Sequence, residues 1–380
     1  MENTELVGNE WQYILDMMPS DLEETAHAKL AIERRREIWD AADLLRLALA
    51  YGVCDLTLRE TSVWAAMAGI GELSDVAVMN RLRRAADWLG YLVVRWLQDH
   101  EFGAAVPQWP VRIVDATVIC KPGSKGTDWR LHLGLDLAQQ RIISAELTGP
   151  EGGETFRRHQ VPAGQIVLGD RGYAQRAGVA HLLQQQAHVV VRLNWQNFPL
   201  QTRAGRPLDL LTCLELVSAG EIGDWPVQFE HEKRSYAMRL IAIRKTAIAA
   251  EKEQKQICHE ARAKGRKPDP RSLRAAHFIF VLTDLLAESL GPGEALELYR
   301  LRWQIEIAFK RLKGLLHLDH LRAKDQRLAM AYLYAKLLGA LLLDQLHQRA
   351  ESFFPWGFPL LRPTTEPLAT RQGTAWPALQ

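Results

Sequence analysis

The sequence predicts an α/β protein in which a mixed β-sheet follows an all-helical region. Up to about residue 97, apolar residues recur with the spacing of amphipathic helices. Further along, short runs rich in β-branched and apolar residues are typical of strands, at residues 111–119, 128–135, 141–147, 165–169 and 188–193. Helical patterns at residues 154–160 and 170–186 flank the fourth run, so the predicted order is β-β-β-α-β-α-β.

Length and composition predict a globular protein with more than one domain. The 380 residues exceed the usual size of a single hydrophobic core, and 47% of them are hydrophobic. The formal net charge of +2 is nearly neutral, so any surface that binds nucleic acid must be local. Four cysteines without a CxxC pair favour reduced thiols in the cytoplasm over zinc ligands or disulfides. The most apolar run, residues 337–343, is too short to span a bilayer and is expected to be a buried helix.

Three helices are expected in the first 100 residues, at residues 30–50, 58–68 and 75–97. A short turn with two glycines separates the second helix from the third, and Ser74 is the expected N-cap of the third. Arg81 and Arg84 lie near the start of the third helix, which is compatible with a helix-turn-helix that reads DNA. A plain helical bundle with an arginine-rich exposed face explains the same pattern equally well.

Two aspartates stand at informative places in the expected sheet. Asp115 interrupts the apolar strand VRIVDATVI, where a carboxylate without a partner is costly and a divalent metal ion is one common partner. Hydrogen bonding at a strand end is the alternative explanation. Asp170 directly follows the fourth strand and opens the sequence Asp-Arg-Gly-Tyr, and ligand sites in α/β sheets form at such strand ends.

An insertion separates these strands from the last part of the chain. Residues 194–290 show a mostly strand-like pattern, at residues 208–211, 225–231, 235–244 and 277–282. Residues 246–274 interrupt this pattern with eight Lys or Arg against four Asp or Glu, a local charge of +4. A solvated helix and loop is the simpler interpretation of that segment's first half.

Some residues of the insertion are candidates for contact with DNA. Lys264, Arg266 and Lys267 form a cation-dense stretch that can bind phosphates. Trp195, directly after the fifth strand, can stack on an unpaired or flipped base. Core or rim packing is the commoner role of such a tryptophan.

The most informative helical pattern covers residues 298–316. At about 100° per residue, one side of this helix is polar and carries Tyr299, Arg302, Glu306, Lys310 and Lys313. The opposite side is apolar and carries Leu298, Leu301, Ile305, Ala308, Leu312 and Leu315. A single acid among basic groups indicates a metal ligand beside a polyanion. An ordinary i,i+4 ion pair between Glu306 and Lys310 is the alternative.

The spacing of Tyr299, Arg302, Glu306 and Lys313 resembles the tyrosine-arginine-glutamate-lysine signature of the insertion-sequence-4 family of bacterial DDE transposases. In that family the first acid precedes a small residue and Ser or Thr, as Asp115 does here, and the second precedes a glycine and an aromatic, as Asp170 does. The resemblance implies a ribonuclease-H-like catalytic fold with Asp115, Asp170 and Glu306 as its catalytic triad. One departure is Asp284, an acid where many relatives carry a neutral polar residue.

The resemblance also implies the chemistry and the partners. The three acids would hold two Mg²⁺ ions, with Mn²⁺ as a substitute, and Tyr299, Arg302, Lys310 and Lys313 would contact DNA phosphates. The expected reaction is hydrolysis at the terminal inverted repeats of a mobile element, followed by strand transfer into target DNA. The expected assembly is a homodimer on DNA, associated with the bacterial nucleoid in the cytoplasm. The alternatives are a ribonuclease-H-like nuclease without strand transfer and a domesticated transposase-derived DNA-binding protein.

The expected organisation has five parts. A helical domain that binds the DNA end covers residues 1–100, and the first part of the catalytic domain covers residues 108–193. The mostly β insertion with its basic helical segment covers residues 194–290, and the second part of the catalytic domain covers residues 291–350. A proline-rich C-terminal tail covers residues 351–380.

Overall fold

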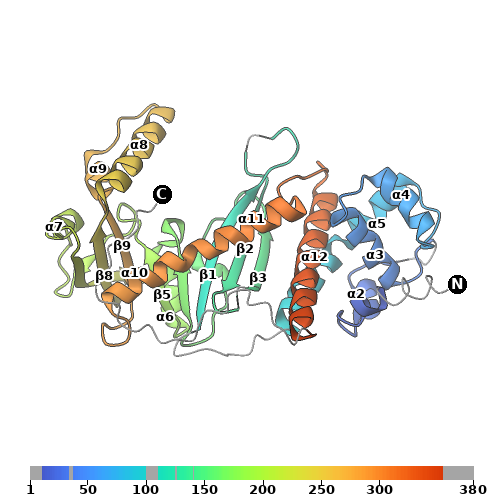
Figure 1. Ribbon diagram of the computed structural model, residues 1–380, viewed down its shortest axis with the longest axis horizontal. Helices are drawn as coiled ribbons and strands as arrows, with labels where there is room; N and C mark the ends of the chain where they lie inside the picture. The colour runs from blue at the N-terminus through green and yellow to red at the C-terminus, as the bar shows by residue number, and fades with distance from the viewer. Residues whose placement is uncertain (1–10, 34–36, 100–109, 125, 140, 354–380) are drawn as a thin grey trace. The chain divides into compact units, whose positions relative to one another are not determined.

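The computed structural model describes residues 11–33, 37–99, 110–124, 126–139 and 141–353 (Figure 1). They form a mixed α/β protein with two compact units. Unit 1 comprises residues 1–105, 116–153 and 305–356, and unit 2 comprises residues 106–115, 154–304 and 357–380. The tail expected at residues 351–380 lies almost entirely outside the described residues.

Unit 1 is mainly helical. It holds α2 (Leu22–Ala28), α3 (Ala41–Gly52), α4 (Leu58–Met67), α5 (Asp75–Asp99), most of α11 (Gln304–Leu316) and α12 (Gln326–Phe353). Helix α12 packs on α3 and α5 (Figure 1). A glycine at position 52 permits the close approach of α3 to α12, because a Cβ there would come within 2.7 Å of the Ala335 Cβ.

The helices expected at residues 58–68 and 75–97 are confirmed as α4 and α5, and the Ser74 hydroxyl accepts a hydrogen bond from the Ala77 N–H. The single helix expected at residues 30–50 is wrong. Helix α2 ends before Leu30, whose φ of 58° reverses the chain, and α3 begins only after Asp40. The Asp40 carboxylate accepts a hydrogen bond from the Asp43 N–H, so a side chain that the apolar spacing does not reveal sets the start of α3.

Helix α12 is the one described helix that is long and apolar enough to cross a membrane by length and composition alone. However, 67% of its stretch Gln326–His347 is buried within the protein. Packing on α3 and α5 therefore accounts for its apolar side chains, as expected for a buried helix.

Unit 1 also contains three strand segments in the order β3-β2-β1. Strands β2 (Trp129–Asp136) and β3 (Arg141–Thr148) pair antiparallel, and β1 (Val111–Ile119) passes from unit 2 into unit 1 after Asp115. The Arg141 guanidinium pairs with the Asp344 carboxylate of α12 at 3.0 Å.

The sheet of unit 2 has the strand order β1-β4-β5-β9-β8-β7-β6. Its strands after β1 are β4 (Ile166–Gly169), β5 (His188–Arg192), β6 (Gln201–Thr202), β7 (Ile222–His231), β8 (Arg234–Arg244) and β9 (Phe278–Thr283). Strand β4 pairs parallel with β1 and with β5, whereas β5–β9, β9–β8, β8–β7 and β7–β6 pair antiparallel. The strands β6 to β9 thus extend the sheet that begins with β1.

Three other predictions for unit 2 need correction. Residues 154–160 hold only the 3₁₀ turn η1 (Phe156–Arg158), and the helix expected at 170–186 is split into the turn η2 (Arg171–Tyr173) and α6 (Arg176–Gln184). The strand expected at residues 208–211 is instead the start of helix α7 (Leu210–Glu215). The four residues at 208–211, Leu-Asp-Leu-Leu, fit a helix turn as well as a strand, so their periodicity could not decide between the two.

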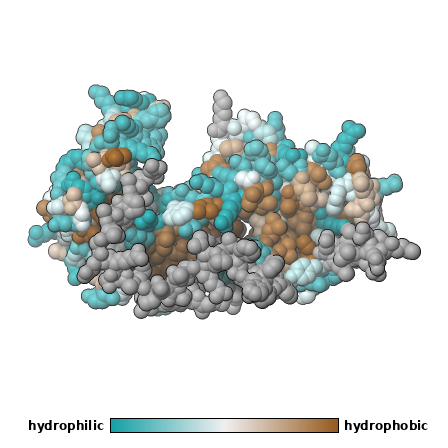
Figure 2. Space-filling view, in the orientation of Figure 1, coloured by the Kyte–Doolittle hydropathy of each residue, from teal (hydrophilic) through white to brown (hydrophobic). Residues whose placement is uncertain are grey.

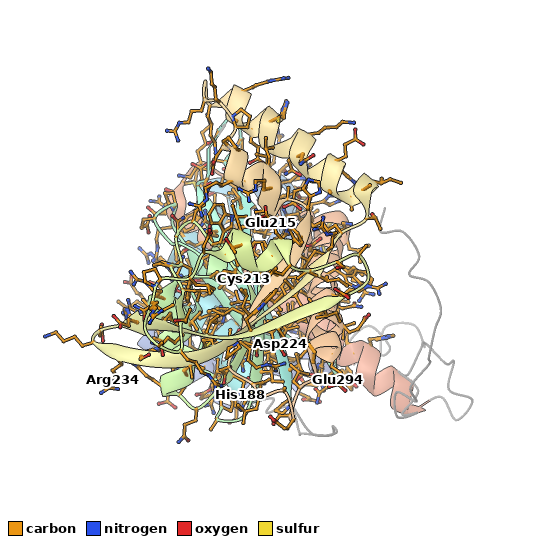
Figure 3. The ribbon with its side chains drawn as sticks, turned by 90° about the vertical axis from the view of Figure 1, so that its left-hand side faces the viewer. His188, Cys213, Glu215, Asp224, Arg234 and Glu294 are labelled. Atoms are coloured by element: carbon orange, nitrogen blue, oxygen red, sulfur yellow. The ribbon has the colours of Figure 1, made fainter. Side chains whose placement is uncertain are left out.

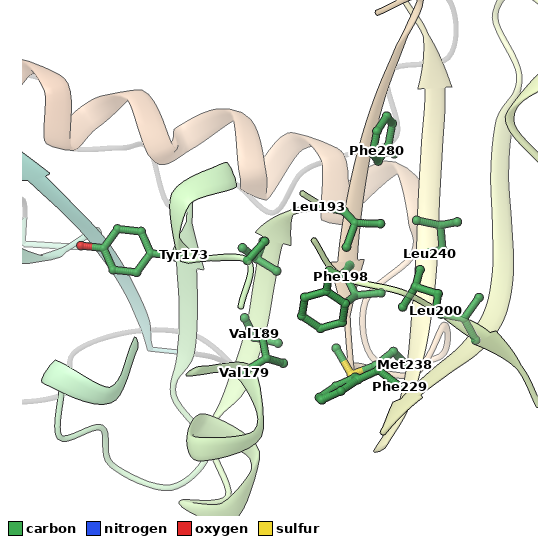
Figure 4. Packing of buried hydrophobic residues seen from close by; sticks show 14 of the residues in the cluster. Tyr173, Val179, Val189, Leu193, Phe198, Leu200, Phe229, Met238, Leu240 and Phe280 are labelled. Carbon is green, nitrogen blue, oxygen red and sulfur yellow. The ribbon is translucent and has the colours of Figure 1, made fainter. Parts of the chain in front are cut away.

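The core of unit 2 lies among α6, α7 and the strands from β4 to β9. Figure 4 shows Phe198, Phe229 and Met238 packed together, with the two phenylalanine ring centroids 5.0 Å apart. Helix α10 (Pro292–Arg300) contacts β5, β7 and β8. The buried Arg239 guanidinium fixes the loop before α10 by donating to the carbonyls of Leu285 and Leu290, at 2.8 and 2.9 Å.

Helices α8 (Ala247–Ala263) and α9 (Pro270–Ala275) project from the ends of β8 and β9 (Figure 1). Their surface is mostly hydrophilic (Figure 2). Arg274 of α9 pairs with Glu215 of α7, which lies beneath the projecting helices in Figure 3. The polar segment expected at residues 246–274 is therefore largely helical.

Candidate active site

The two aspartates stand side by side on neighbouring parallel strands, Asp115 in the middle of β1 and Asp170 directly after the end of β4. In the β1–β4 pair, Ile113 lies opposite Leu168. The same alignment carried two residues further places Asp115 opposite Asp170. Adjacent strands are about 4.8 Å apart, so the backbone alone brings these two carboxylates together.

A tight turn fixes the Asp170 carboxylate. Its Oδ1 accepts hydrogen bonds from the N–H groups of Gly172 and Tyr173, at 2.8 and 3.4 Å, and so caps η2. A Cβ at position 172 would come within 2.1 Å of the Glu154 Oε2, so a larger residue there would require the Glu154 side chain to move.

Arg302 supplies positive charge to the first aspartate. It lies in the 3₁₀ turn η3 (Leu301–Trp303), and its Nη1 is 3.3 Å from the Asp115 Oδ2. The side chains of Asp115 and Arg302 are 16% and 18% exposed, so water screens this ion pair only partly. Burial raises the pKa of nearby Tyr299, and Arg302 opposes that rise. Two residues of the signature thus lie beside the aspartates.

Tyr173 is a residue of this site whose role the sequence did not predict. Its side chain is fully buried against Phe156, with ring centroids 5.1 Å apart, and its hydroxyl points away from the other labelled core residues in Figure 4. That hydroxyl has no hydrogen-bond partner among the described residues. Burial raises the tyrosine pKa, and Asp115 and Asp170 raise it further. The phenol therefore stays protonated beside the carboxylates, and its place after the glycine of Asp-Arg-Gly-Tyr was the only sequence signal.

Arg192 is a second residue that the sequence analysis missed. The β4–β5 register places Gly169 opposite Val191, and one further step places Asp170 opposite Arg192. Burial lowers the pKa of Arg192, and the nearby Arg171 and Arg302 lower it too. The available signal was a single cation at the end of the apolar run HVVVR.

Comparisons with known proteins identify the family. Residues 108–343 match the family described as "Transposase DDE domain". The chain belongs to the DDE transposase family. It is 37% identical over 355 residues to the transposase for insertion sequence element IS421 of Escherichia coli, which covers 91% of this chain and 96% of that relative.

Two further relatives of this DDE transposase-family chain have similar names. The putative transposase InsL for insertion sequence element IS186A of Escherichia coli (strain K12) is 37% identical over 354 residues, 91% of this chain and 96% of the relative. The transposase for insertion sequence element IS231F of Bacillus thuringiensis subsp. israelensis is 24% identical over 263 residues, 61% of this chain and 55% of the relative.

The other residues predicted on the polar face of this family member's helix lie on α11. Glu306, Lys310 and Lys313 belong to unit 1, so their role beside the aspartates of unit 2 stays a prediction. The buried face of α11 consists of Ile305, Phe309, Leu312 and Leu316. Two leucines expected on the apolar face, Leu301 and Leu315, are instead 39% and 77% exposed.

The residues of this transposase-family chain fit a divalent cation in part. Two carboxylates offer the hard oxygen ligands that Mg²⁺ prefers, and a cationic guanidinium already pairs with one of them. Nowhere in the described residues do three His, Cys, Asp or Glu side chains come close enough together to hold a metal ion. The structure therefore assembles two of the three predicted ligands within one unit.

The other predicted DNA-binding residues lie elsewhere. Arg81 and Arg84 on α5 pair with Glu37 and Glu33, at 3.8 and 2.8 Å. Lys264, Arg266 and Lys267 are exposed after the end of α8. Trp195 lines a cavity of about 400 Å³ with Phe198 and Leu208, and the Arg271 guanidinium lies 5.2 Å from its ring centroid. Their contact with DNA stays a prediction.

Asp284, the departure from the family pattern, has a structural partner. Its carboxylate accepts hydrogen bonds from the Val189 N–H at 2.8 Å and from the His188 imidazole, whose Nδ1 is 2.7 Å away. Both bonds fix the start of β5, which ends at Arg192.

The hydrogen bond to Asp284 raises the pKa of His188 above its ordinary value. The pair therefore stabilises the fold fully below about pH 6.5, and this contribution disappears as the pH rises through the folded-state pKa. We expect Asp284→Asn to lower the free energy of unfolding more below about pH 6 than above about pH 9. Urea unfolding at both pH values measures this difference, and equal losses would contradict the assignment.

Proposed function

We propose that this chain is the transposase of a bacterial insertion sequence, of the insertion-sequence-4 family, which cuts DNA at the element's terminal inverted repeats and joins the ends to target DNA. The observation that carries the proposal is the alignment of Asp115 with Asp170 beside Arg302. The family match and the names of the relatives support it independently. The spacing of Tyr299, Arg302, Glu306 and Lys313 supports the finer family assignment.

In this proposal Asp115, Asp170 and Glu306 hold two Mg²⁺ ions. The spacing of four residues between Arg302 and Glu306 in the sequence supports the inclusion of Glu306. Bound there, the cations would activate the attacking oxygen and stabilise the departing one. Arg302, Lys310, Lys313 and Tyr299 position the DNA strand through phosphate contacts.

The proposed organisation follows the sequence. Residues 1–100 bind the DNA end, residues 108–193 and 291–350 form the ribonuclease-H-like catalytic domain, and residues 194–290 are the insertion. Two copies would pair two DNA ends. The insertion contributes Trp195 and the basic stretch that follows α8, and aromatic stacking on an unpaired base contributes about 1–3 kcal/mol.

A cleavage and strand-transfer assay tests this function. The substrate is a labelled duplex with the terminal repeat of the encoding element, and the proteins are the wild type and Glu306→Gln, each with Mg²⁺ or EDTA. We expect Glu306→Gln to lower cleavage and joining by at least about a hundredfold, because it removes a ligand charge. Binding of the duplex should be retained.

Glu297→Gln is the matched control, since Glu297 is an exposed glutamate of the preceding helix α10 that pairs only loosely with Arg300, at 3.7 Å. It should cut like the wild type. Wild-type cleavage by Glu306→Gln would remove Glu306 from the triad. Metal-dependent cleavage without joining would favour a nuclease over a transposase.

A further inference from the structure

Three cations from separate parts of unit 2 converge on one carboxylate. Glu253 of α8 accepts from the Arg171 Nη2 at 3.0 Å and from the Arg192 Nη2 at 2.9 Å. The Lys245 ammonium, at the end of β8, contacts the other oxygen of the same carboxylate. We call these four residues the Glu253 cluster.

The Glu253 cluster is short of negative charge. Three basic side chains face one carboxylate, so the cluster carries a net positive charge. Lys245 is only 8% exposed, and burial together with the positive charges of Arg192 and Arg171 lowers its pKa to about 7. A second anion would therefore stabilise the cluster.

The position of the Glu253 cluster indicates which anion. Arg171 directly follows Asp170 in the chain, and Arg192 lies opposite Asp170 in the extended β4–β5 register. The Arg171 side chain is 46% exposed, so a ligand can reach the cluster from solvent. A phosphate bound here would lie beside the proposed catalytic acid.

Glu253 itself is held in a way that permits exchange. The Glu253 side chain is itself 24% exposed, so solvent and a competing anion can reach its carboxylate. A carboxylate and a phosphate present similar oxygens to an arginine fork. The cluster can thus accept one in place of the other.

We propose that Arg171, Arg192 and Lys245 form a binding site for a DNA phosphate, and that Glu253 occupies this site until DNA displaces it. The inference rests on the proposed function, because it takes DNA as the ligand. In this proposal Glu253 competes with the DNA phosphate for the same cations. Lys245 contacts the phosphate only after DNA has displaced Glu253.

Binding to a short fluorescein-labelled duplex of arbitrary sequence, in EDTA and over a series of salt concentrations, tests the inference. We expect Glu253→Gln to bind about fivefold more tightly than the wild type, because the competing ion pairs are weakened. We expect Lys245→Gln to bind more weakly and to lower the slope of log K against log salt by about 0.9, the effect of one lost phosphate contact. Arg171→Gln, at the exposed edge, should act in the same direction as Lys245→Gln.

Glu251→Gln is the matched control for Glu253→Gln. Glu251 lies on the same helix, is 64% exposed and pairs with Lys255, so its loss removes the same charge away from the cluster. Its affinity should change by less than about twofold. Thermal unfolding of each variant verifies that it is folded.

If Glu253 only stabilises the fold, Glu253→Gln should not bind DNA more tightly than the wild type. Weaker DNA binding by Glu253→Gln, or tightening equal to that of Glu251→Gln, would overturn the inference. So would an unchanged salt slope in both Lys245→Gln and Arg171→Gln. Failure of the wild type to bind any duplex would instead contradict the proposed function.

Discussion

Replacement of Asp170 by asparagine is expected to abolish DNA cleavage while the protein stays folded. The Oδ1 of asparagine can still accept the N–H groups of Gly172 and Tyr173, so the η2 turn is retained. The substitution removes only the negative charge beside Asp115. Because groups that act as one catalytic unit are strongly non-additive, we expect a loss of at least about a thousandfold in the cleavage rate.

The measurement for Asp170→Asn is single-turnover cleavage of the terminal-repeat duplex with Mg²⁺. Asp269→Asn is the control, because Asp269 also caps a helix in unit 2 by accepting a backbone N–H, that of Arg271 at 3.0 Å. It should cleave at the wild-type rate. Substantial activity in Asp170→Asn, with an unchanged unfolding midpoint, would show that the aligned aspartates are structural.

Replacement of Asp55 by asparagine is expected to lower the free energy of unfolding of unit 1 by about 3–5 kcal/mol, because it leaves a buried ammonium without its acid. Lys336 of α12 is fully buried, and its Nζ is 3.4 Å from the Asp55 Oδ1. The ammonium also donates to the Leu316 carbonyl at the end of α11. Asparagine preserves the left-handed backbone at position 55, where φ is 60°.

Chemical unfolding measures the loss in Asp55→Asn, and a double variant supplies its control. Asp55→Asn combined with Lys336→Met removes both charges, so it should recover part of the stability that Asp55→Asn loses. Burial lowers the pKa of Lys336 while Asp55 raises it, which is consistent with an ammonium that depends on its partner. This account would be contradicted if the double variant lost more free energy of unfolding than Asp55→Asn and Lys336→Met lose together.

Much of the fold was predictable from local patterns. The strands β1, β2, β3, β7, β8 and β9 were predicted to within a few residues, because runs of β-branched and apolar residues of that length rarely form any other secondary structure. The failures have two separate causes. The start of α3 depends on a capping carboxylate, and the start of α7 lies in the segment Leu-Asp-Leu-Leu, which is too short to reveal a period.

The candidate site was predictable in its acids and less so in its surroundings. Asp115 and Asp170 were recognisable because a carboxylate in or directly after an apolar strand is costly to bury without a partner. Arg192, Lys245 and Glu253 did not, because each is an ordinary charged residue until the sheet brings β5, β8 and α8 together. Charge clusters assembled from residues 53 and 61 positions apart leave no local signature.

The parallel register of β1, β4 and β5 also determines which changes in chain length the protein can accept. The row Asp115, Asp170 and Arg192 is spaced by backbone hydrogen bonds and not by the loops that join the strands. Insertions or deletions in the β2–β3 turn or after η1 would leave that row intact. A one-residue deletion within the four-residue strand β4 would reverse its alternation and turn the Asp170 carboxylate to the opposite face. Related proteins with this sheet can therefore differ in the lengths of their loops, but not in the lengths of these strands.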